Sequence, residues 1–271
     1  MPGRRNSRTE ARVENPCYRV IDSHCHLTDP RLHQQLEDVL RRAATAGVSR
    51  VITIGTSIDD DIAAITLCHG RENLRCAVGI HPNYCHQAEL ADVEKLRELQ
   101  RDPSVVALGE MGLDYFHKFA ERDRQKKFFE AQLKLAVEFN RPIVIHSREA
   151  IADTLEILSG FPAVRAVFHS FTGTLDEAMH ILDAGYLIGF TGPITFKKND
   201  SLRQVVKRTP RDRLLIETDA PYLTPEPMRK QKTNEPAMVV HTAKVVADQW
   251  GVSVEEVDRV TTENIERFFG W

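Results

Sequence analysis

Tyr18-Arg-Val-Ile-Asp-Ser-His-Cys-His26 is a short β-rich run that ends in polar residues, and it separates two candidate folds. In an open, doubly wound sheet that binds dinucleotides, the first strand is followed by the glycine-rich loop G-x-G-x-x-G. Here the residues that follow the run at 18–22 are Ser-His-Cys-His, and the glycines are absent. The stretch therefore argues against the open sheet and places two histidines directly after a predicted strand.

Beyond this stretch, β-rich runs alternate with amphipathic segments along the chain. The amphipathic segments are clearest at residues 31–46 and 121–140, where apolar side chains recur at helical spacing. Alternation of this kind predicts parallel strands joined by crossover helices, and eight units predict a single (β/α)8 barrel over residues 16–271. The predicted strands are 18–22, 50–55, 75–79, 105–110, 142–146, 163–169, 185–190 and 213–219.

Length and composition agree with one globular domain. The chain has 271 residues, of which 42% are hydrophobic and 28% are charged. No apolar run is long enough for a membrane span. Residues 1–15 contain arginines but no apolar stretch, so we interpret them as a flexible extension and not as a secretory signal.

The cysteines indicate the compartment in which the protein acts, and the net charge limits the kinds of partner that it can bind. The five cysteines form no C-x-x-C pair, which is typical of reduced thiols and indicates a cytoplasmic protein. We expect a monomer with no membrane partner. The formal net charge of −3 excludes a nucleic-acid-binding protein of the strongly basic kind. A polyanionic substrate would have to be held by a local basic patch or by metal ions.

Residues with metal-binding side chains stand at the ends of the predicted strands. In a barrel of this kind, function concentrates at the carboxyl ends of the strands. The residues found there, in chain order, are His24, His26, Glu110, His146, His169 and Asp219. Each of them alone has an ordinary explanation as a turn former or a hydrogen-bonded histidine, but their joint occurrence at strand ends favours a metal site.

The chemistry of this set indicates two metal ions. His24 and His26 are two residues apart, so on a strand both imidazoles point to one face, whereas Cys25 points away and is expected to pack in the core. Four histidines and two carboxylates are too many for one ordinary site. They suit two divalent cations (Mg, Mn, Zn or similar) bridged by a carboxylate and roughly 3.5–4 Å apart. The other histidines fall on helices or loops, except His81, which follows the third strand and is expected to contact substrate or orient a ligand.

Several residues near the predicted mouth are candidates for substrate binding. Arg148 follows His146 by two positions and would face the same opening. Arg229 and Lys230 belong to a basic loop after the last strand, where barrels often bind phosphate. Tyr222 and Phe171 are candidates for stacking on a base. For each of these residues, a solvated surface or the core is the competing interpretation.

These motifs, taken in order, resemble those of the TatD-type deoxyribonuclease family. The resemblance runs from about Val20 to Phe269. The motifs that carry it are Asp22-Ser-His-Cys-His26, Gly79-Ile-His-Pro82, Ala107-Leu-Gly-Glu-Met-Gly-Leu-Asp114, Ile145-His-Ser-Arg148, His169-Ser-Phe-Thr-Gly173, Glu217-Thr-Asp-Ala-Pro-Tyr-Leu223 and Asn234-Glu-Pro236.

The resemblance implies a barrel similar to the metal-dependent amidohydrolases and a divalent-metal-dependent 3′→5′ exonuclease acting on DNA, with RNA accepted by some members. It implies that His24, His26 and Asp219 hold the first metal and that Glu110 bridges the two. His146 and His169 would hold the second metal. Many amidohydrolases bridge their metals with a carbamylated lysine. Here that place is occupied by Glu110, which favours the deoxyribonuclease branch.

The mechanism that we expect is hydrolysis by a water activated between two metals, with Asp219 and Glu110 as the catalytic carboxylates. The same site also suits lactones, amides, phosphotriesters and aminoacyl esters, and the basic residues at the mouth favour a phosphodiester over these. A third hypothesis is a metal-binding protein without catalytic activity, for which replacing Glu110 by alanine would leave function intact.

Overall fold

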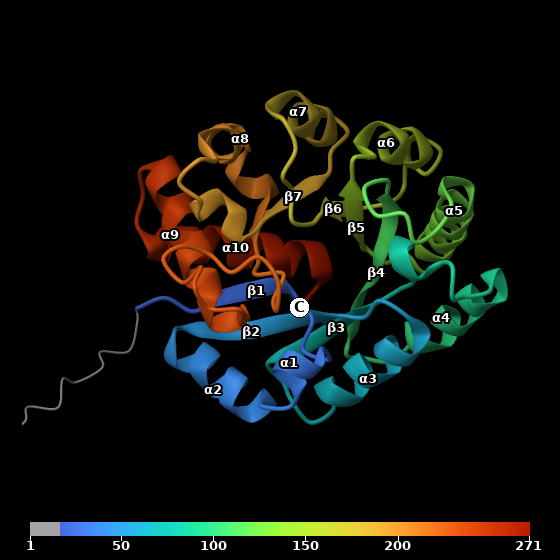
Figure 1. Cartoon of the computed structure of the whole chain (residues 1–271), viewed down its shortest axis with the longest axis horizontal. Helices are drawn as coiled ribbons and strands as arrows, with labels where there is room; N and C mark the ends of the chain where they lie inside the picture. Colours follow the sequence, from blue (N-terminus) through green and yellow to red (C-terminus); the bar gives the residue numbers. More distant parts are fainter. Residues whose placement is uncertain (1–16) are drawn as a thin grey trace, which may run out of the picture.

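The strands form one sheet in which every strand lies beside its neighbour in sequence. The computed structural model describes residues 17–271, so the predictions about residues 1–15 and the boundary at residue 16 lie outside it. The order is β1 to β8, with all neighbouring pairs parallel, and the helices surround the strands (Figure 1). The predicted (β/α)8 barrel is confirmed. The strands are β1 Val20–Cys25, β2 Val48–Ile54, β3 Leu74–Val78, β4 Val105–Asp114, β5 Ile143–Arg148, β6 Ala166–Phe168, β7 Leu187–Phe190 and β8 Leu214–Ile216.

The helices differ from expectation in one place. The segment predicted as one helix over 31–46 is two helices, because Gln35 has φ of −131° and ψ of 32°, outside the helical region. The helices are α1 Pro30–His33, α2 Leu36–Thr45, α3 Ile58–Cys68, α4 Val93–Leu99, α5 Arg122–Phe139, α6 Ile151–Ser159, α7 Leu175–Asp183, α8 Asp200–Arg208, α9 Val239–Trp250 and α10 Val254–Phe269. Short 3-10 turns are η1 Pro82–Tyr84, η2 Leu90–Asp92, η3 Gly192–Thr195, η4 Arg211–Arg213 and η5 Pro236–Met238.

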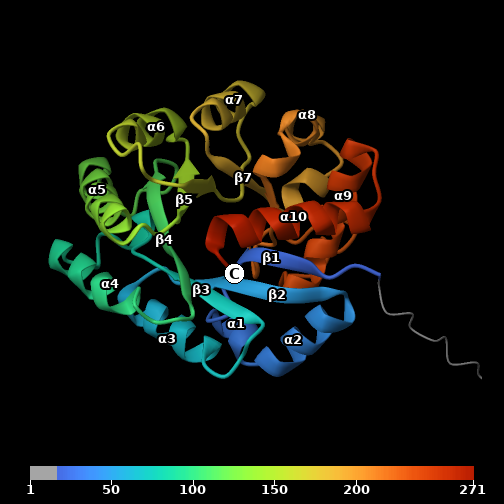
Figure 2. The ribbon, with the colours of Figure 1, turned by 180° about the vertical axis from the view of Figure 1, so that it is seen from behind.

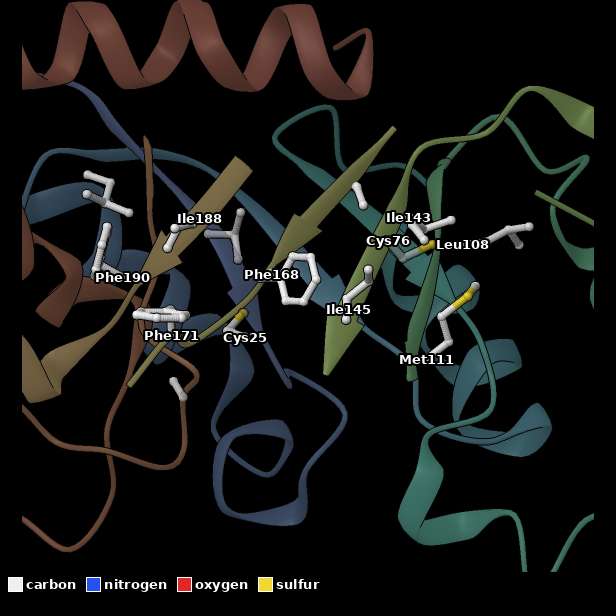
Figure 3. Packing of buried hydrophobic residues seen from close by; sticks show 14 of the residues in the cluster. Cys25, Cys76, Leu108, Met111, Ile143, Ile145, Phe168, Phe171, Ile188 and Phe190 are labelled. Atoms are coloured by element: carbon white, nitrogen blue, oxygen red, sulfur yellow. The ribbon is translucent and has the colours of Figure 1, made fainter. Parts of the chain in front are cut away.

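Apolar side chains pack on both faces of the strands, as expected for a parallel sheet. The larger cluster joins strands to helices, and Figure 3 shows Phe168 and Phe190 of this cluster with the buried Cys25. Phe171 belongs to the same cluster and is only 4% exposed, so it is a core residue and not a stacking platform. Cys25 packs in the core, as predicted.

A second cluster joins the opposite face of the strands to the C-terminal helix. Ile52 and Ile54 of β2 belong to it, together with Ile265, Phe268 and Phe269 of α10. Figure 2 shows α10 lying across this end of the barrel. Because α10 covers the amino ends of the strands, the carboxyl ends are left to form a site.

The first and last strands meet through side chains as well as backbone. Asp22 accepts two hydrogen bonds from Thr218, from the backbone N–H at 2.9 Å and from the hydroxyl at 2.6 Å. Nearby, the Asp219 N–H donates to the His24 carbonyl at 2.9 Å, and the His26 N–H donates to the Ala220 carbonyl at 2.7 Å. This seam between β1 and β8 therefore holds three of the predicted metal ligands in place.

β4 approaches β5 closely just after Glu110, and we predict that Gly112→Ala destabilises the protein. Gly112 has φ of +135°, and a Cβ there would lie 2.1 Å from the carbonyl oxygen of His146. We expect a loss of about 1–3 kcal/mol in the free energy of unfolding, measured by urea titration. The matched control is Gly160→Ala. Gly160 has φ of −74°, and a Cβ there would have no neighbour nearer than 3.4 Å. Equal effects of the two substitutions would contradict the steric argument.

Candidate metal centre

The structure brings the six predicted ligands together at the carboxyl ends of the strands. His24 lies in β1, Glu110 in β4 and His146 in β5, while the other three follow β1, β6 and β8. Their ligand atoms form overlapping groups in which all atoms lie within 4.8 Å of one another. One group is His24, His26 and Asp219, a second is His24, Glu110 and His169, and a third is His81, Glu110 and His146.

Glu110 lies at the centre of this arrangement. Its Oε1 is 2.7 Å from His169 Nε2 and 2.8 Å from His146 Nδ1, and its Oε2 is 3.5 Å from His24 Nε2. Burial alone would raise the pKa of Glu110, but the surrounding histidines, His169 foremost, hold it well below its usual range. Glu110 is therefore an ionised carboxylate that faces two groups of histidines with its two oxygens, as a bridging ligand requires.

Asp219 faces the first group, at the seam between β1 and β8. Its Oδ1 is 3.4 Å from His26 Nε2 and 3.8 Å from His24 Nε2. His26 Nδ1 is 3.1 Å from the carbonyl oxygen of Ile54, which can only accept a hydrogen bond. In neutral His26, Nδ1 therefore carries the proton and Nε2 offers its lone pair to the centre. A histidine that is oriented in this way by a backbone carbonyl is typical of a metal ligand.

The surroundings of His24 indicate whether the site fits a metal. It is fully buried, and neither ring nitrogen has a hydrogen-bond partner among residues 17–271. Burial lowers its pKa to about 4, so the ring is neutral at pH 7. Its ring stacks on that of His169, with centroids 3.9 Å apart. A neutral imidazole with an unpaired buried nitrogen is costly unless that nitrogen binds something, and a divalent cation between His24, Glu110 and their neighbours would satisfy it.

His146 is held between two carboxylates. Its Nε2 is 3.0 Å from Asp114 Oδ2, on the side away from Glu110. Burial would lower the pKa of His146, but the hydrogen bonds to Asp114 and Glu110 raise it to about 9. Without a cation, the ring therefore donates to both carboxylates. With a cation at Nδ1, the bond from Nε2–H to Asp114 would remain and would orient the ring.

His81 differs from the other histidines of the site. Its Nδ1 accepts a hydrogen bond from the Asn83 N–H at 3.0 Å, and burial lowers its pKa. In the neutral ring, Nε2 must then carry the proton, and this N–H points at Glu110 Oε1 at 3.3 Å. Although His81 is close enough to join the third group, it presents a donor and not a lone pair. This geometry favours contact with an oxygen of the substrate over metal ligation.

Other buried polar residues support the ligands. Asp114 accepts from the backbone N–H of His117 as well as from His146, so it orients both a loop and a predicted ligand. Glu217 accepts from the Ser170 N–H and lies 3.7 Å from His169 Nδ1, and burial raises its pKa to about 7.

Sequence reasoning gave no role to Asp22 or Asn234. Asp22 bonds Thr218 at the seam, and Asn234 donates to the carbonyl oxygens of Thr218 and Tyr222. The only signal for them was their place within two of the quoted motifs.

The residues predicted to bind substrate differ in how close they lie to the six predicted metal ligands. Tyr222 is 48% exposed, and its ring lies 6.1 Å from that of His26, so it borders the ligands. Arg148 ends β5, and its guanidinium lies 4.1 Å from the ring of Phe116. Arg229 lies over another aromatic ring, that of Phe196, at 3.8 Å.

Lys230 is less closely tied to the site. It is exposed and makes no hydrogen bond or ion pair with the six residues in the described part of the chain. The structure therefore places Tyr222 beside the centre and gives no contact that brings Lys230 to it.

A comparison with known proteins agrees with this geometry. The model of the family described as "TatD related DNase" matches residues 21–270. The chain belongs to this family. The TatD family match covers all six residues of the centre, and the protein is a metal-dependent hydrolase.

Relatives and solved structures give the same family. The chain is 40% identical over 255 residues to the uncharacterized metal-dependent hydrolase YcfH of Escherichia coli, with 92% of this chain and 95% of the relative covered. It is 34% identical to the 3′-5′ ssDNA/RNA exonuclease TatD of Citrobacter koseri, covering 93% and 99%. Among solved structures, the TatD homologue YjjV of Escherichia coli has a TM-score of 0.89 at 30% identity, covering 93% of this chain and 98% of that one.

The contact between Asp114 and His146 leads to a prediction about metal affinity. We expect Asp114→Asn to weaken divalent-metal binding about 10- to 100-fold, because the ring of His146 loses the carboxylate that orients it. Equilibrium dialysis against Mn²⁺ measures this. The control is Asp153→Asn, because Asp153 bonds Tyr115 and Lys126 and not the ligands. Equal affinities in the two variants would show that Asp114 does not act through His146.

Proposed function

We propose that the protein hydrolyses phosphodiester bonds of DNA, as a 3′→5′ exonuclease on single strands or ends that needs two divalent cations. The observation that carries the proposal is the position of Glu110, whose two oxygens face different histidines, His24 on one side and His146 and His169 on the other. Such a position would allow Glu110 to contact two cations at once, which supports a two-metal site. The name of the Citrobacter koseri relative, a 3′-5′ ssDNA/RNA exonuclease, supports this substrate class and adds RNA as a second one.

The cations would supply positive charge that lowers the pKa of water and neutralises the phosphate oxygens. The residues of the chain would do the rest. Asp219 is partly buried, and this desolvation alone would raise its pKa, but its hydrogen bond to His26 and the nearby His169 hold the pKa below the usual value. As an ionised carboxylate, it can accept the proton of the attacking water. His81 would donate its Nε2–H to an oxygen of the phosphate, in the tautomer fixed by Asn83.

The mouth of the site carries aromatic rings paired with arginines. Arg31 lies 4.6 Å from the ring of Tyr222, and Arg148 lies 4.1 Å from the ring of Phe116, which is about half exposed. Rings of this kind stack on unpaired bases, while guanidinium groups contact phosphates. Because the net charge is −3, the strand would be held by local cations such as these and by the metals, and not by the charge of the whole protein. This favours single strands or ends over tightly bound duplex.

The first test is cleavage of a short single-stranded DNA that is labelled at the 3′ or the 5′ end. Metal-stripped protein should cleave it only after Mg²⁺, Mn²⁺ or Zn²⁺ is added, and the product ladder of the 5′-labelled strand should shorten stepwise from the 3′ end. We expect Glu110→Gln and His146→Ala to lose activity by at least about 100-fold. His69→Ala is the control, because His69 is exposed and pairs with Asp102.

Activity that persists in Glu110→Gln would contradict the two-metal mechanism. If protein that binds two metals cleaves neither DNA nor RNA, the phosphodiester proposal fails and ester and amide substrates become the next to test.

A second test concerns base stacking. We expect Tyr222→Ala to raise KM for a single-stranded oligonucleotide roughly 5- to 100-fold with a small change in kcat, because one aromatic platform is worth about 1–3 kcal/mol per base. Tyr222→Phe keeps the ring and should retain a KM close to that of the wild type. Steady-state kinetics on the same labelled strand measure both. An unchanged KM in Tyr222→Ala would remove Tyr222 from the substrate site.

A further inference from the structure

A hollow of about 600 Å³ lies at the amino ends of the strands, on the opposite side from the metal centre. Its wall is formed by the end of α6, the loops before β6 and β7, the starts of these two strands, η4 and the last turn of α10. Figure 2 shows this end of the barrel, with α10 across it. The volume falls within the range of about 300–1,000 Å³ that is typical of small-molecule sites. None of the six metal-centre residues lines it, so a ligand there would leave the mouth open.

Three arginines from different elements line this hollow: Arg165, Arg213 and Arg267. Each guanidinium donates a hydrogen bond to a backbone carbonyl oxygen. The acceptors are, in the same order, Phe268, Gly185 and Asp212. Arg165 and Arg267 are exposed and Arg213 is partly buried, so these bonds restrict the guanidinium groups without fixing them, and they lower part of the entropic cost of binding.

The hydrogen bonds to backbone carbonyl oxygens do not use all N–H donors of the three guanidinium groups. A guanidinium has five N–H donors. In Arg267, Nη2 serves both the Asp212 carbonyl and Asn264 Oδ1, at 2.8 and 2.7 Å, while Nε and Nη1 make no hydrogen bond with the described residues. A role in fixing the wall therefore accounts for Nη2 of Arg267 and leaves Nε and Nη1 as two separate donors. In Arg213 the backbone bond uses only Nη1, so within residues 17–271 the edge formed by Nε and Nη2 is free to hold an anion with two hydrogen bonds.

The charge of the hollow selects an anion. Among its lining residues, Asp212 is the one carboxylate that accompanies the three guanidinium groups. Its Oδ2 is 4.0 Å from Arg213 Nε, and its side chain is 67% exposed, so this ion pair is weak. The local charge is therefore +2 in a chain whose formal net charge is −3. The planar fork of arginine matches the geometry of a phosphate group.

The remaining wall is mostly apolar, with Ser159 as a further polar residue. Val164, Tyr186 and Phe268 line it, and each keeps a small exposed surface. A free inorganic anion would use the arginines only, whereas an ester with an apolar or aromatic group would use both parts of the hollow. We propose that this hollow binds a small phosphate ester of that chemistry, for which a nucleoside monophosphate is the probe. This inference does not rest on the proposed nuclease activity.

The test is calorimetric titration of the full-length protein with deoxyadenosine monophosphate, inorganic phosphate, deoxyadenosine and a short oligonucleotide. We expect the monophosphate to bind most tightly, and Arg267→Gln to weaken its binding about tenfold or more. Ala184→Glu adds a negative charge to an exposed lining residue without removing a side-chain contact, and it should weaken binding as much. This second variant keeps the test valid if Arg267→Gln fails to fold.

Two controls separate the hollow from the rest of the molecule. Arg259→Gln changes an arginine of α10 that pairs with Glu256 and Glu263 outside the hollow, and it should bind as the wild type does. Glu110→Gln should also retain binding. If binding is lost in Glu110→Gln, the ligand occupies the metal centre and the proposal is overturned. Equal binding by wild type, Arg267→Gln and Ala184→Glu overturns it as well. So does equal affinity for phosphate and monophosphate, or binding of the oligonucleotide alone.

Discussion

The buried carboxylate of Glu110 constrains everything around it. An ionised carboxylate removed from water costs far more free energy than a folded domain has to spare, unless opposite charge and hydrogen bonds surround it. In this protein the opposite charge comes from the histidines at the ends of neighbouring strands. Protons on some imidazoles can supply this charge, and so could cations in their place. Asp114, Asn83 and the carbonyl of Ile54 then fix which nitrogen of each ring faces inward.

Much of this arrangement can be predicted from the sequence, because the apolar runs and the metal-binding residue types point to the same positions. The apolar runs locate the strands, and the polar residues that end them fall together once the strands are parallel. What could not be predicted depends on local backbone geometry. Gln35 breaks a helix although the apolar spacing continues through it. The role of His81 depends on the backbone N–H of Asn83. Tyr222 and Phe171 look alike in sequence, yet one is half exposed and the other is in the core, because burial is decided by elements far away in the chain.

The two ends of the barrel differ in what they bury: apolar side chains at the amino end and polar side chains at the carboxyl end. At the amino end, α10 supplies Ile265, Phe268 and Phe269 to an apolar layer that needs no partner other than the strands. At the carboxyl end, polar residues are buried at a cost that apolar packing elsewhere must offset. The hollow lined by arginines lies at the packed end. A ligand there would contact the end of the barrel that α10 covers, away from the six predicted metal ligands.

The seam between β1 and β8 has a consequence for how the protein is made. His24 lies in the first strand and His26 directly follows it, while Asp219 follows the last strand. The three meet at the seam where Thr218 donates its hydrogen bonds to Asp22. During synthesis the histidines leave the ribosome long before the aspartate, so a nascent chain offers metals an incomplete set of ligands. A cation could therefore contact all three residues of the first group only after the end of β8 has met β1. If the proposed site binds metal, its loading would distinguish complete chains from truncated ones.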